Sequence, residues 1–431
     1  MGRVCWAFWA ILVLGASTAT AQAPRAVTLA EALRLAASHD PNVVQAQGNL
    51  RSAGSGLRAA KSQYLPSLTA SSNGGSSFTD GPGRPDPITG AIVSGQSSQS
   101  LSMGLSSDVD LFTGFRRGGD VKAANAREDG AAASVDESMA RSALETSGDF
   151  FSALASRELV EARKRSVARA EQQLSIAVAK LTTRSANVAD SLRAVVQLGE
   201  ARLNLASEEA SLARAEASLA RRIGFRGRVA AMEDSSLIVP GPPLDTAAIM
   251  AEAITRAPAV RRTEASVRGA EGSLSSAKSS YWPQLRLSGN YAYAGRRTDS
   301  LYNQRNITLG LSWPLFNRFQ REQQVSERQT TLDTEIARAE DAKREISANL
   351  TTQFAALDAA RERIALTRLS VQAAQADVTV ALERYRLGSI TITELNAAEA
   401  GLTRAEEAAV SARFEYLRAK SQIEAILGRK L

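Results

Sequence analysis

The amino-acid sequence predicts a mainly α-helical protein with a smaller β portion, in which one unit of two strands and two long helices occurs twice. Three observations predict this fold class. Residues 41–68 match residues 258–285 along their whole length. Two long stretches without proline carry apolar residues at heptad spacing, and alternating apolar and polar residues precede each stretch. A duplication of this length indicates that both copies build the same supersecondary structure.

The first 21 residues have the order of a secretory signal peptide. Arg3 precedes the apolar run Val4–Leu14, and small residues follow up to Ala21. This is the order of n-region, h-region and A-x-A cleavage site, and the apolar run is shorter than the ~20 residues of a spanning helix. We therefore expect export of the chain and removal of residues 1–21, which include the only cysteine, Cys5.

Two repeats follow the signal peptide, at residues 22–240 and 241–431, and each is expected to open with short helices. In the first repeat we predict a helix near Thr28–Ala37 and a second helix over Pro41–Gln63. Asp40 supplies the cap of the second helix, and a proline occupies its first turn, where its missing N–H costs nothing.

Each repeat then contains a predicted β-hairpin, at about 65–110 and 283–314. Apolar residues or glycine alternate with polar residues over Leu285–Tyr293 and Ile307–Trp313. Strands of ~10 residues with one apolar face have the pattern and length of bilayer-crossing β-strands, although a soluble sheet with one wet face shows the same periodicity. The Gly- and Pro-rich segment Gly74–Gln96 is expected to form a long external loop.

A long helix is predicted after each hairpin, at about 116–182 and 317–387. In the second, apolar residues recur every seven positions over Val325–Ile346 and again over Leu350–Tyr385. This spacing is typical of a coiled-coil seam, and the four-residue step between the two runs is a stutter. A helix of about 70 residues is ~105 Å long, which is longer than a globular domain is wide.

A shorter helix is predicted to return from the end of each long helix, so that the helix pairs occupy about 116–224 and 317–428. Gly388 ends the second long helix and Thr391–Glu394 has the pattern of a capping box, while Asn187 holds the equivalent place in the first repeat. One returning helix and one short opening helix together nearly equal a long helix. We therefore expect two short helices, stacked end to end, to flank each long one.

Four membrane-competent strands are too few to close a barrel. An open sheet edge in hydrocarbon leaves unpaired backbone groups that cost several kcal/mol each, and small bacterial barrels need about eight strands. Two chains would give a tight eight-stranded barrel that side chains fill. We therefore predict a homotrimer with a transmembrane twelve-stranded β-barrel, continued by a trimeric α-barrel through ~100 Å of periplasm.

Composition and motifs favour no other class of function. The net charge of +7 is spread over helical segments without a basic cluster that contains aromatic residues, so nucleic-acid binding is not expected. His39 is the only histidine and no serine lies in a nucleophile elbow, so we expect no enzyme, no metal site and no cofactor. The alternative of a different class is a periplasmic coiled-coil adaptor or scaffold without a barrel.

The chain resembles TolC-type outer-membrane efflux proteins. The resemblance rests on the pattern Ala-Lys-Ser-x-Tyr-x-Pro-x-Leu at 60–68 and 277–285, on Leu-Ser-Trp-Pro-Leu-Phe at 311–316, and on the segment 384–395. It implies the exit duct of a tripartite efflux pump in the cell outer membrane, which conducts substrates passively from a periplasmic adaptor and an inner-membrane pump. A type I protein secretion duct is the alternative, and the sequence does not identify the cargo.

The resemblance also implies roles for residues at the periplasmic tip. Glu394 matches an acidic residue of a constriction, while a second acid of the family falls on Ala397. Tyr385 and Asp190 match an aperture latch between helices, whose usual basic partner falls on Ile390. From the residues alone, Glu394 is a capping-box partner and Tyr385 is a seam residue of the coiled coil.

Two further groups of residues complete the predicted sites. The adaptor is expected to dock on the helix turns that contain Gly388, Ser389, Ser185 and Asn187. Aromatic rings of the strands are expected at the membrane interface, where such rings sit at headgroup level. These membrane-interface aromatics are Tyr291, Tyr293 and Trp313.

Overall fold

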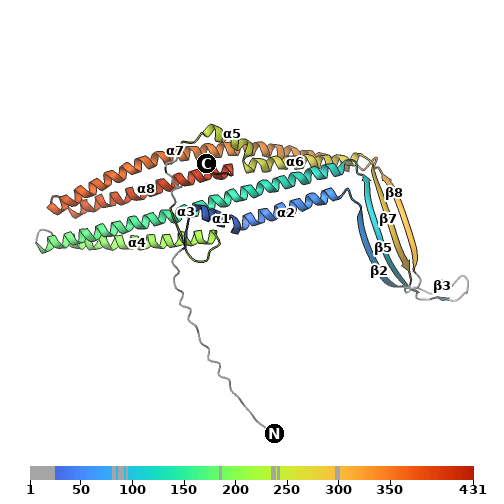
Figure 1. Ribbon diagram of the computed structural model, residues 1–431, viewed down its shortest axis with the longest axis horizontal. Coiled ribbons are helices and arrows are strands. Elements are labelled where there is room, and N and C mark those ends of the chain that lie inside the picture. Colours follow the sequence, from blue (N-terminus) through green and yellow to red (C-terminus); the bar gives the residue numbers. More distant parts are fainter. Residues whose placement is uncertain are drawn as a thin grey trace, which may run out of the picture.

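The computed structural model describes residues 25–79, 84–85, 92–93, 96–183, 187–233, 239, 243–296 and 301–431. The predicted signal peptide and Ser185 lie outside these residues. The described chain forms one elongated layer of helices with a sheet at one end, and the far ends of the two long helices lie at the other end (Figure 1). The mainly α-helical fold with four long strands is therefore as the sequence predicts.

The sheet contains four antiparallel strands in the order β2-β5-β7-β8. Their bounds are Ser67–Thr79, Gln96–Phe112, Gln284–Gly295 and Tyr302–Ser312. The expectation of a loop over Gly74–Gln96 is wrong at both ends, because Gly74 pairs with Leu101 and Thr79 with Gln96. Continuous ladder hydrogen bonds hold this glycine- and serine-rich segment as strand in spite of its weak intrinsic propensity. The short strands β3 (Arg84–Pro85) and β4 (Ile92–Val93) pair beyond it.

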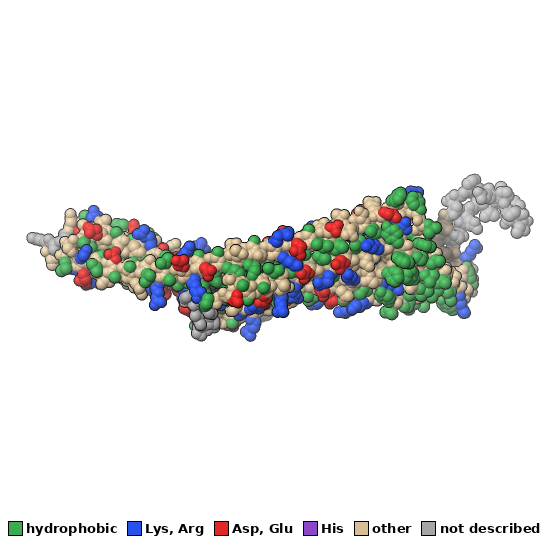
Figure 2. All heavy atoms as spheres, turned by 90° about the horizontal axis from the view of Figure 1, so that it is seen from above, with side chains coloured by type: hydrophobic (Ala, Val, Ile, Leu, Met, Phe, Trp, Pro, Cys, Tyr) green, Lys and Arg blue, Asp and Glu red, His purple; other side chains and the backbone are tan. Residues whose placement is uncertain are grey.

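The strand register gives the sheet one apolar and one polar face. Leu287 lies opposite both Val109 and Leu309, and Gly289 lies opposite Ile307. Since side chains alternate between faces, the residues beside these belong to the other face. That polar face carries Asp108, Asp110, Arg286, Ser288, Asn290 and Thr308. Hydrophobic side chains accordingly gather at the sheet end of the molecule, whereas charges are spread along the helices (Figure 2).

Two long helices run the length of the layer, and shorter helices flank them in pairs. α2 and α4 lie along one side of α3, and α6 and α8 lie between α3 and α7. The helix columns thus have the same order as the strands. None of the helices in the described part of the chain is long and apolar enough to cross a membrane. The helices are α1 (Leu29–His39), α2 (Pro41–Ser62), α3 (Arg116–Thr182), α4 (Val188–Arg222), α5 (Thr246–Arg256), α6 (Pro258–Lys278), the 3-10 turn η1 (Ser279–Tyr281), α7 (Gln320–Leu387) and α8 (Ile392–Leu427).

The predicted heptad seam of α7 is confirmed by its burial. Leu350 and Tyr385 are at most 2% exposed, and the other seam positions are buried or half-buried. Apolar residues outside the seam remain exposed on the two outermost columns, α4 and α7. These exposed side chains are Leu192, Val195, Val196 and Leu203 on α4 and Ile336, Leu366, Leu369 and Val380 on α7.

Each returning helix meets a short helix of its own repeat at a glycine. Gly224 follows α4 at φ +78° and Gly428 follows α8 at φ +71°, a region that only glycine adopts without strain. A Cβ atom on Gly224 would lie 2.8 Å from the His39 ring, and one on Gly428 would lie 2.9 Å from Pro258. The two joints are equivalent, because His39 precedes α2 and Pro258 begins α6. His39 itself is exposed.

The two repeats come into close contact where α3 runs beside α6. A Cβ atom on Gly119 would lie 2.5 Å from the backbone nitrogen of Ser276, and one on Gly272 would lie 2.5 Å from that of Ala123. The backbones of the two helices therefore touch directly, without side chains between them. The sequence offers no periodic signal for this contact, since only two glycines create it.

A second link between segments far apart in the chain was not predicted. β1 (Arg25–Val27) and β6 (Val229–Ala231) pair in parallel beside the middle of α3. Val27, Val229 and Ala231 are at most 2% exposed and join the main core. Strands of three residues carry too little alternation to be recognised from sequence.

We predict that Gly119→Ala separates α3 from α6 and lowers the thermal stability of the protein. The added methyl group meets backbone atoms that cannot rotate away, and overpacking of this kind costs roughly 1–3 kcal/mol. Gly118→Ala is the matched control, because no atom lies within 4 Å of its Cβ position and alanine favours a helix by about 1 kcal/mol. The melting temperature in detergent, followed by circular dichroism, should fall for Gly119→Ala only. Equal melting temperatures for the two variants would contradict the direct backbone contact.

Candidate functional site

The helix layer has a hollow on one side, close to the sheet. A hollow of about 590 Å³ is lined by residues of α2, α3, α6, β7 and α7 together. Because α2, α3, α6 and α7 lie side by side in that order, a hollow that all four line must lie on the concave side of the layer. Its lining is polar and includes Gln63, Arg116, Asp120, Arg127 and Arg328.

The concave side of the helices continues into the polar face of the sheet. A neighbouring hollow of about 550 Å³ is lined by Asp108, Asp110 and Arg286 from the sheet and by Arg116 and Asp120 from α3. Arg116 and Asp120 line both hollows. The described chain therefore has one continuous polar and concave surface at this level, and the apolar face of the sheet points the opposite way.

Ion pairs hold the strands and α3 together on this concave surface. Arg286 lies 3.4 Å from the carboxylate of Asp110 and 3.9 Å from that of Asp108, while Arg116 lies 3.6 Å from Asp110. Arg117 donates a hydrogen bond to the backbone carbonyl of Asp110. These pairs are partly exposed, so they position the chain more than they stabilise it.

Aromatic residues form two groups at opposite ends of the strands. Tyr291 and Tyr293 pack edge to face, 5.5 Å between ring centroids, in the half of β7 away from the helices. Trp313 lies at the helix end, where its Nε1 donates a hydrogen bond of 3.2 Å to the carbonyl of Tyr281. From Leu285 to Tyr293 a strand extends ~26 Å, close to the apolar height of a transmembrane barrel.

Further aromatic residues, which sequence reasoning missed, join Trp313 at the helix end. Phe115 packs 5.4 Å from Phe112 and 5.8 Å from Trp282, and Phe319 packs 5.7 Å from Phe316. Phe115 and Phe319 have φ values of 71° and 61° and are 65% and 70% exposed. A bulky side chain at positive φ is strained. The equivalent strand-to-helix turns of both repeats thus accept strain and present an aromatic ring outward.

At the opposite end of the molecule, Tyr385 lies inside the tip. It is 2% exposed and packs with residues of α3, α4, α7 and α8, among them Ala177, Ala194 and Leu395. Its hydroxyl has no hydrogen-bond partner in the described chain. Burial raises the pKa of the Tyr385 phenol, and the nearby negative charge of Asp190 raises it further. The seam role is therefore observed, and Asp190 is close enough to act on Tyr385 electrostatically.

The two helix turns at the tip have the caps expected from sequence. Thr391 accepts a hydrogen bond of 3.3 Å from the backbone N–H of Glu394, and its hydroxyl donates one of 3.1 Å to the Glu394 carboxylate. Thr391 thus caps α8 as the capping-box pattern predicts, but the Glu394 carboxylate bonds to the Thr391 hydroxyl and not to its backbone N–H. Glu394 remains exposed. Gly388 caps α7 at φ +79°, and Asn187 caps α4 by accepting from Ala189. Both turns lie at the same end of the molecule (Figure 1).

Behind the tip, ion pairs join α3 to α8, and sequence reasoning missed them. Arg169 lies 2.7 Å from Glu399 and 3.6 Å from Glu406, and Arg165 lies 3.5 Å from Glu406. Burial raises the pKa of the Glu399 carboxyl, and the charge of Arg169 opposes that rise. Glu399 and Glu406 are seven residues apart, so a heptad search for charged residues would have found one side of this contact.

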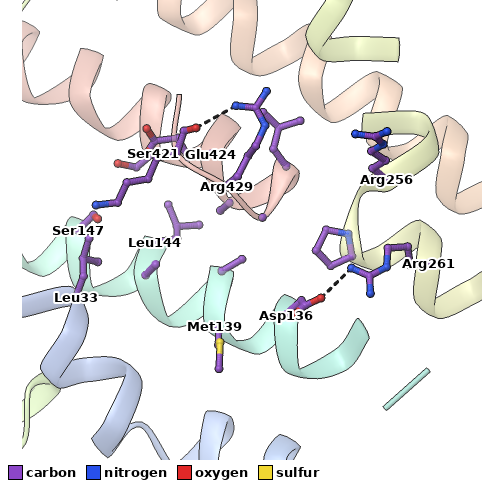
Figure 3. A pocket seen from close by; sticks show the side chains of 17 residues that line it. Leu33, Asp136, Met139, Leu144, Ser147, Arg256, Arg261, Ser421, Glu424 and Arg429 are labelled. Atoms are coloured by element: carbon purple, nitrogen blue, oxygen red, sulfur yellow. Dashed lines mark hydrogen bonds and ion pairs between the residues drawn. The ribbon is translucent and has the colours of Figure 1, made fainter. Parts of the chain in front are cut away.

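A third hollow, of about 330 Å³, lies at the joint between α6 and α8 (Figure 3). Arg261 there donates a 2.8 Å hydrogen bond to Asp136, and Arg429, also at this joint, pairs with Glu252 at 2.6 Å. These arginines are therefore engaged in holding the joint. Within the described residues, no group of three or more His, Cys, Asp or Glu side chains is arranged to hold a metal ion.

Comparison with solved structures shows the fold of outer-membrane channels. CusC is 15% identical with a TM-score of 0.79, over 93% of this chain and 92% of CusC. The CmeC outer membrane channel of Campylobacter jejuni is 15% identical with a TM-score of 0.79, over 93% and 85% of the two chains. VceC of Vibrio cholerae is 14% identical with a TM-score of 0.76, over 93% and 96%.

The sequence matches the family "Outer membrane efflux protein" over residues 32–224 and 249–429. No curated protein matches the sequence. The family match includes both repeats, the helix joints and both tip turns. The chain therefore belongs to the outer membrane efflux protein family, as a duct of the outer membrane whose helical portion extends into the periplasm.

Proposed function

We propose that three copies of this chain form the passive exit duct of a tripartite efflux pump. The observation that carries this proposal is the continuous polar concave surface, backed on the sheet by an apolar face. Three such layers, joined edge to edge, enclose a polar lumen and turn apolar side chains toward lipid. In this proposal residues 1–21 are removed on export, and the repeats 22–240 and 241–431 each supply half of a protomer's wall.

The two edges of the layer support the trimer. β2 and β8 are edge strands within one chain, and such edges leave backbone groups unpaired in hydrocarbon. Along the helices, the same two edges expose apolar residues of α4 and α7. If β8 and α7 of one protomer pack on β2 and α4 of the next, both unsatisfied edges are covered by one contact. Twelve strands then close the barrel.

In the proposed barrel, the two aromatic groups mark the upper and lower limits of the apolar band that faces lipid. Tyr291 and Tyr293 lie at the outer interface of the membrane, and Trp313 lies at the periplasmic interface. The ~26 Å of strand between them suits the hydrocarbon thickness that an outer-membrane barrel spans.

The tip is proposed to be the periplasmic aperture. Three copies of Glu394 would form an acidic ring there, and Tyr385 with Asp190 would tie α7 to α4 as a latch. The turns with Gly388, Ser389, Ser185 and Asn187 would receive a periplasmic adaptor, which links the duct to an inner-membrane pump. The exposure of Glu394, Gly388, Ser389 and Asn187 supports these roles, as does the charge of Asp190 near the Tyr385 hydroxyl.

We predict that Ile307→Arg prevents assembly in the outer membrane, whereas Thr308→Arg is tolerated. Ile307 is 82% exposed on the apolar face near the middle of the strands, and Thr308 is the adjacent residue on the polar face. An arginine on the lipid side near the bilayer midplane costs about 2–4 kcal/mol. The measurement is the yield of heat-resistant trimer from outer-membrane fractions. Similar yields for the two variants would reject this assignment of faces.

We also predict that Glu394→Gln reduces the cation preference of the duct without weakening the tip. Glutamine serves as well as glutamate at this capping-box position, so the melting temperature should not change. Removal of three carboxylates from one ring weakens the attraction of cations, which the reversal potential in a planar bilayer under a KCl gradient measures. Glu383→Gln is the control, because this carboxylate is paired with Arg386 at 2.6 Å. An identical shift for both variants would argue against a ring at Glu394.

A further inference from the structure

Two arginines on the concave surface beside the sheet have no partner within the described chain. Arg127 on α3 and Arg328 on α7 both line the hollow of about 590 Å³, and both are exposed. Neither makes an ion pair or a hydrogen bond with any residue that the structure describes. By contrast, Arg116 and Arg286 at the same level lie next to carboxylates.

The side chains that line this part of the concave surface carry more positive than negative charge. Four arginines and three aspartates line the two joined hollows, which leaves a surplus of one positive charge per protomer. Asp108 and Asp110 are engaged by Arg286 and Arg116, and Asp120 accepts a 2.6 Å hydrogen bond from Ser276. Within the described chain, Arg127 and Arg328 are therefore the arginines of the two hollows without a paired carboxylate, and Asp120 is the only carboxylate of the two hollows without a paired arginine, which accounts for the surplus of one positive charge.

We propose that Arg127 and Arg328 form a ring that attracts anions inside the duct, where the helical wall joins the barrel. This inference rests on the proposed trimer, in which both side chains face the lumen and occur three times. The ring would hold small multivalent anions, of the carboxylate or phosphate class, on their way into the barrel. Guanidinium groups suit this task, because they present several N–H donors in a plane that matches such anions.

The ring and the tip then carry opposite charges. Glu394 places carboxylates at the periplasmic end, whereas Arg127 lies about 55 residues of α3 from that end and Arg328 about 60 residues of α7. Because the Debye length is ~10 Å at 0.1 M salt, the two rings act independently. The selectivity at each level is therefore set by the residues of that level.

The test is the ion selectivity of single channels of the full-length protein in a planar bilayer at low salt. Arg127→Gln with Arg328→Gln changes the surplus per protomer from one positive to one negative charge. We expect the permeability ratio of chloride to potassium to fall by about threefold or more. Citrate added on the barrel side should partly block the wild-type conductance and should not block that of the double variant.

Two control variants separate charge from structure. Arg127→Lys with Arg328→Lys keeps the charge and should keep the wild-type permeability ratio. Arg58→Gln removes an arginine of α2 that does not line the hollow. At about 100° per residue, Arg58 lies roughly 100–160° around the helix from the α2 residues that do, namely Gly56, Ala59 and Ala60. This variant should leave both the ratio and the citrate block unchanged. If the double variant yields no trimer, Arg328→Gln alone removes the surplus and should lower the ratio in the same direction.

An unchanged permeability ratio and an unchanged citrate block in the Gln variants would overturn the anion ring. An equal effect of Arg58→Gln would overturn it as well, because that residue does not line the hollow. A wild-type protein that forms no channel at all would instead refute the proposed duct. The failure of this inference and the failure of the proposed function are therefore distinguishable.

Discussion

Backbone hydrogen bonding in a lipid environment is the constraint on which the rest of this structure depends. Four antiparallel strands satisfy one another internally, but β2 and β8 have an unpaired side, and hydrocarbon offers no water to satisfy it. The helix layer also has two unsatisfied edges, because α4 and α7 expose hydrophobic side chains at the same two margins. In the proposed trimer, one lateral contact between protomers would cover both the unpaired strand edges and the exposed apolar side chains.

The internal duplication explains why the β-strands and the helix columns have the same order across the layer. Each repeat supplies two strands, one long helix and a column of two short helices, so strands and columns have the same order across the layer. The repeats join where Gly119 and Gly272 let α3 and α6 touch backbone to backbone. Each column of short helices is joined at a glycine that faces His39 or Pro258. Small residues at a few points thus set the spacing of the whole wall.

Much of this architecture could be predicted from sequence because its main elements are periodic. The heptads of α7 indicated which residues are buried, and alternation over Leu285–Tyr293 indicated the apolar face. Single positions with no period could not be predicted in this way. The strand ends beyond Gly74 depend on pairing with Leu101 and its neighbours, and the β1–β6 pair depends on residues about 200 positions apart. The direction in which Arg127 and Arg328 point required the curvature of the layer, which no local pattern encodes.

The links between sheet and helices have a mechanical consequence. β5 ends at Phe112 and α3 begins at Arg116, with Phe115 held at positive φ between them; η1 ends at Tyr281 and β7 begins at Gln284. The first of these connections holds Phe115 at a strained φ, and the second is only two residues long, so neither leaves much free backbone between strand and helix. Torque applied at the far end of the helices is therefore transmitted to the barrel unless the helices themselves untwist. In the proposed duct, any rotation of the helix tips would therefore be taken up along the long helices, and the sheet would keep its position.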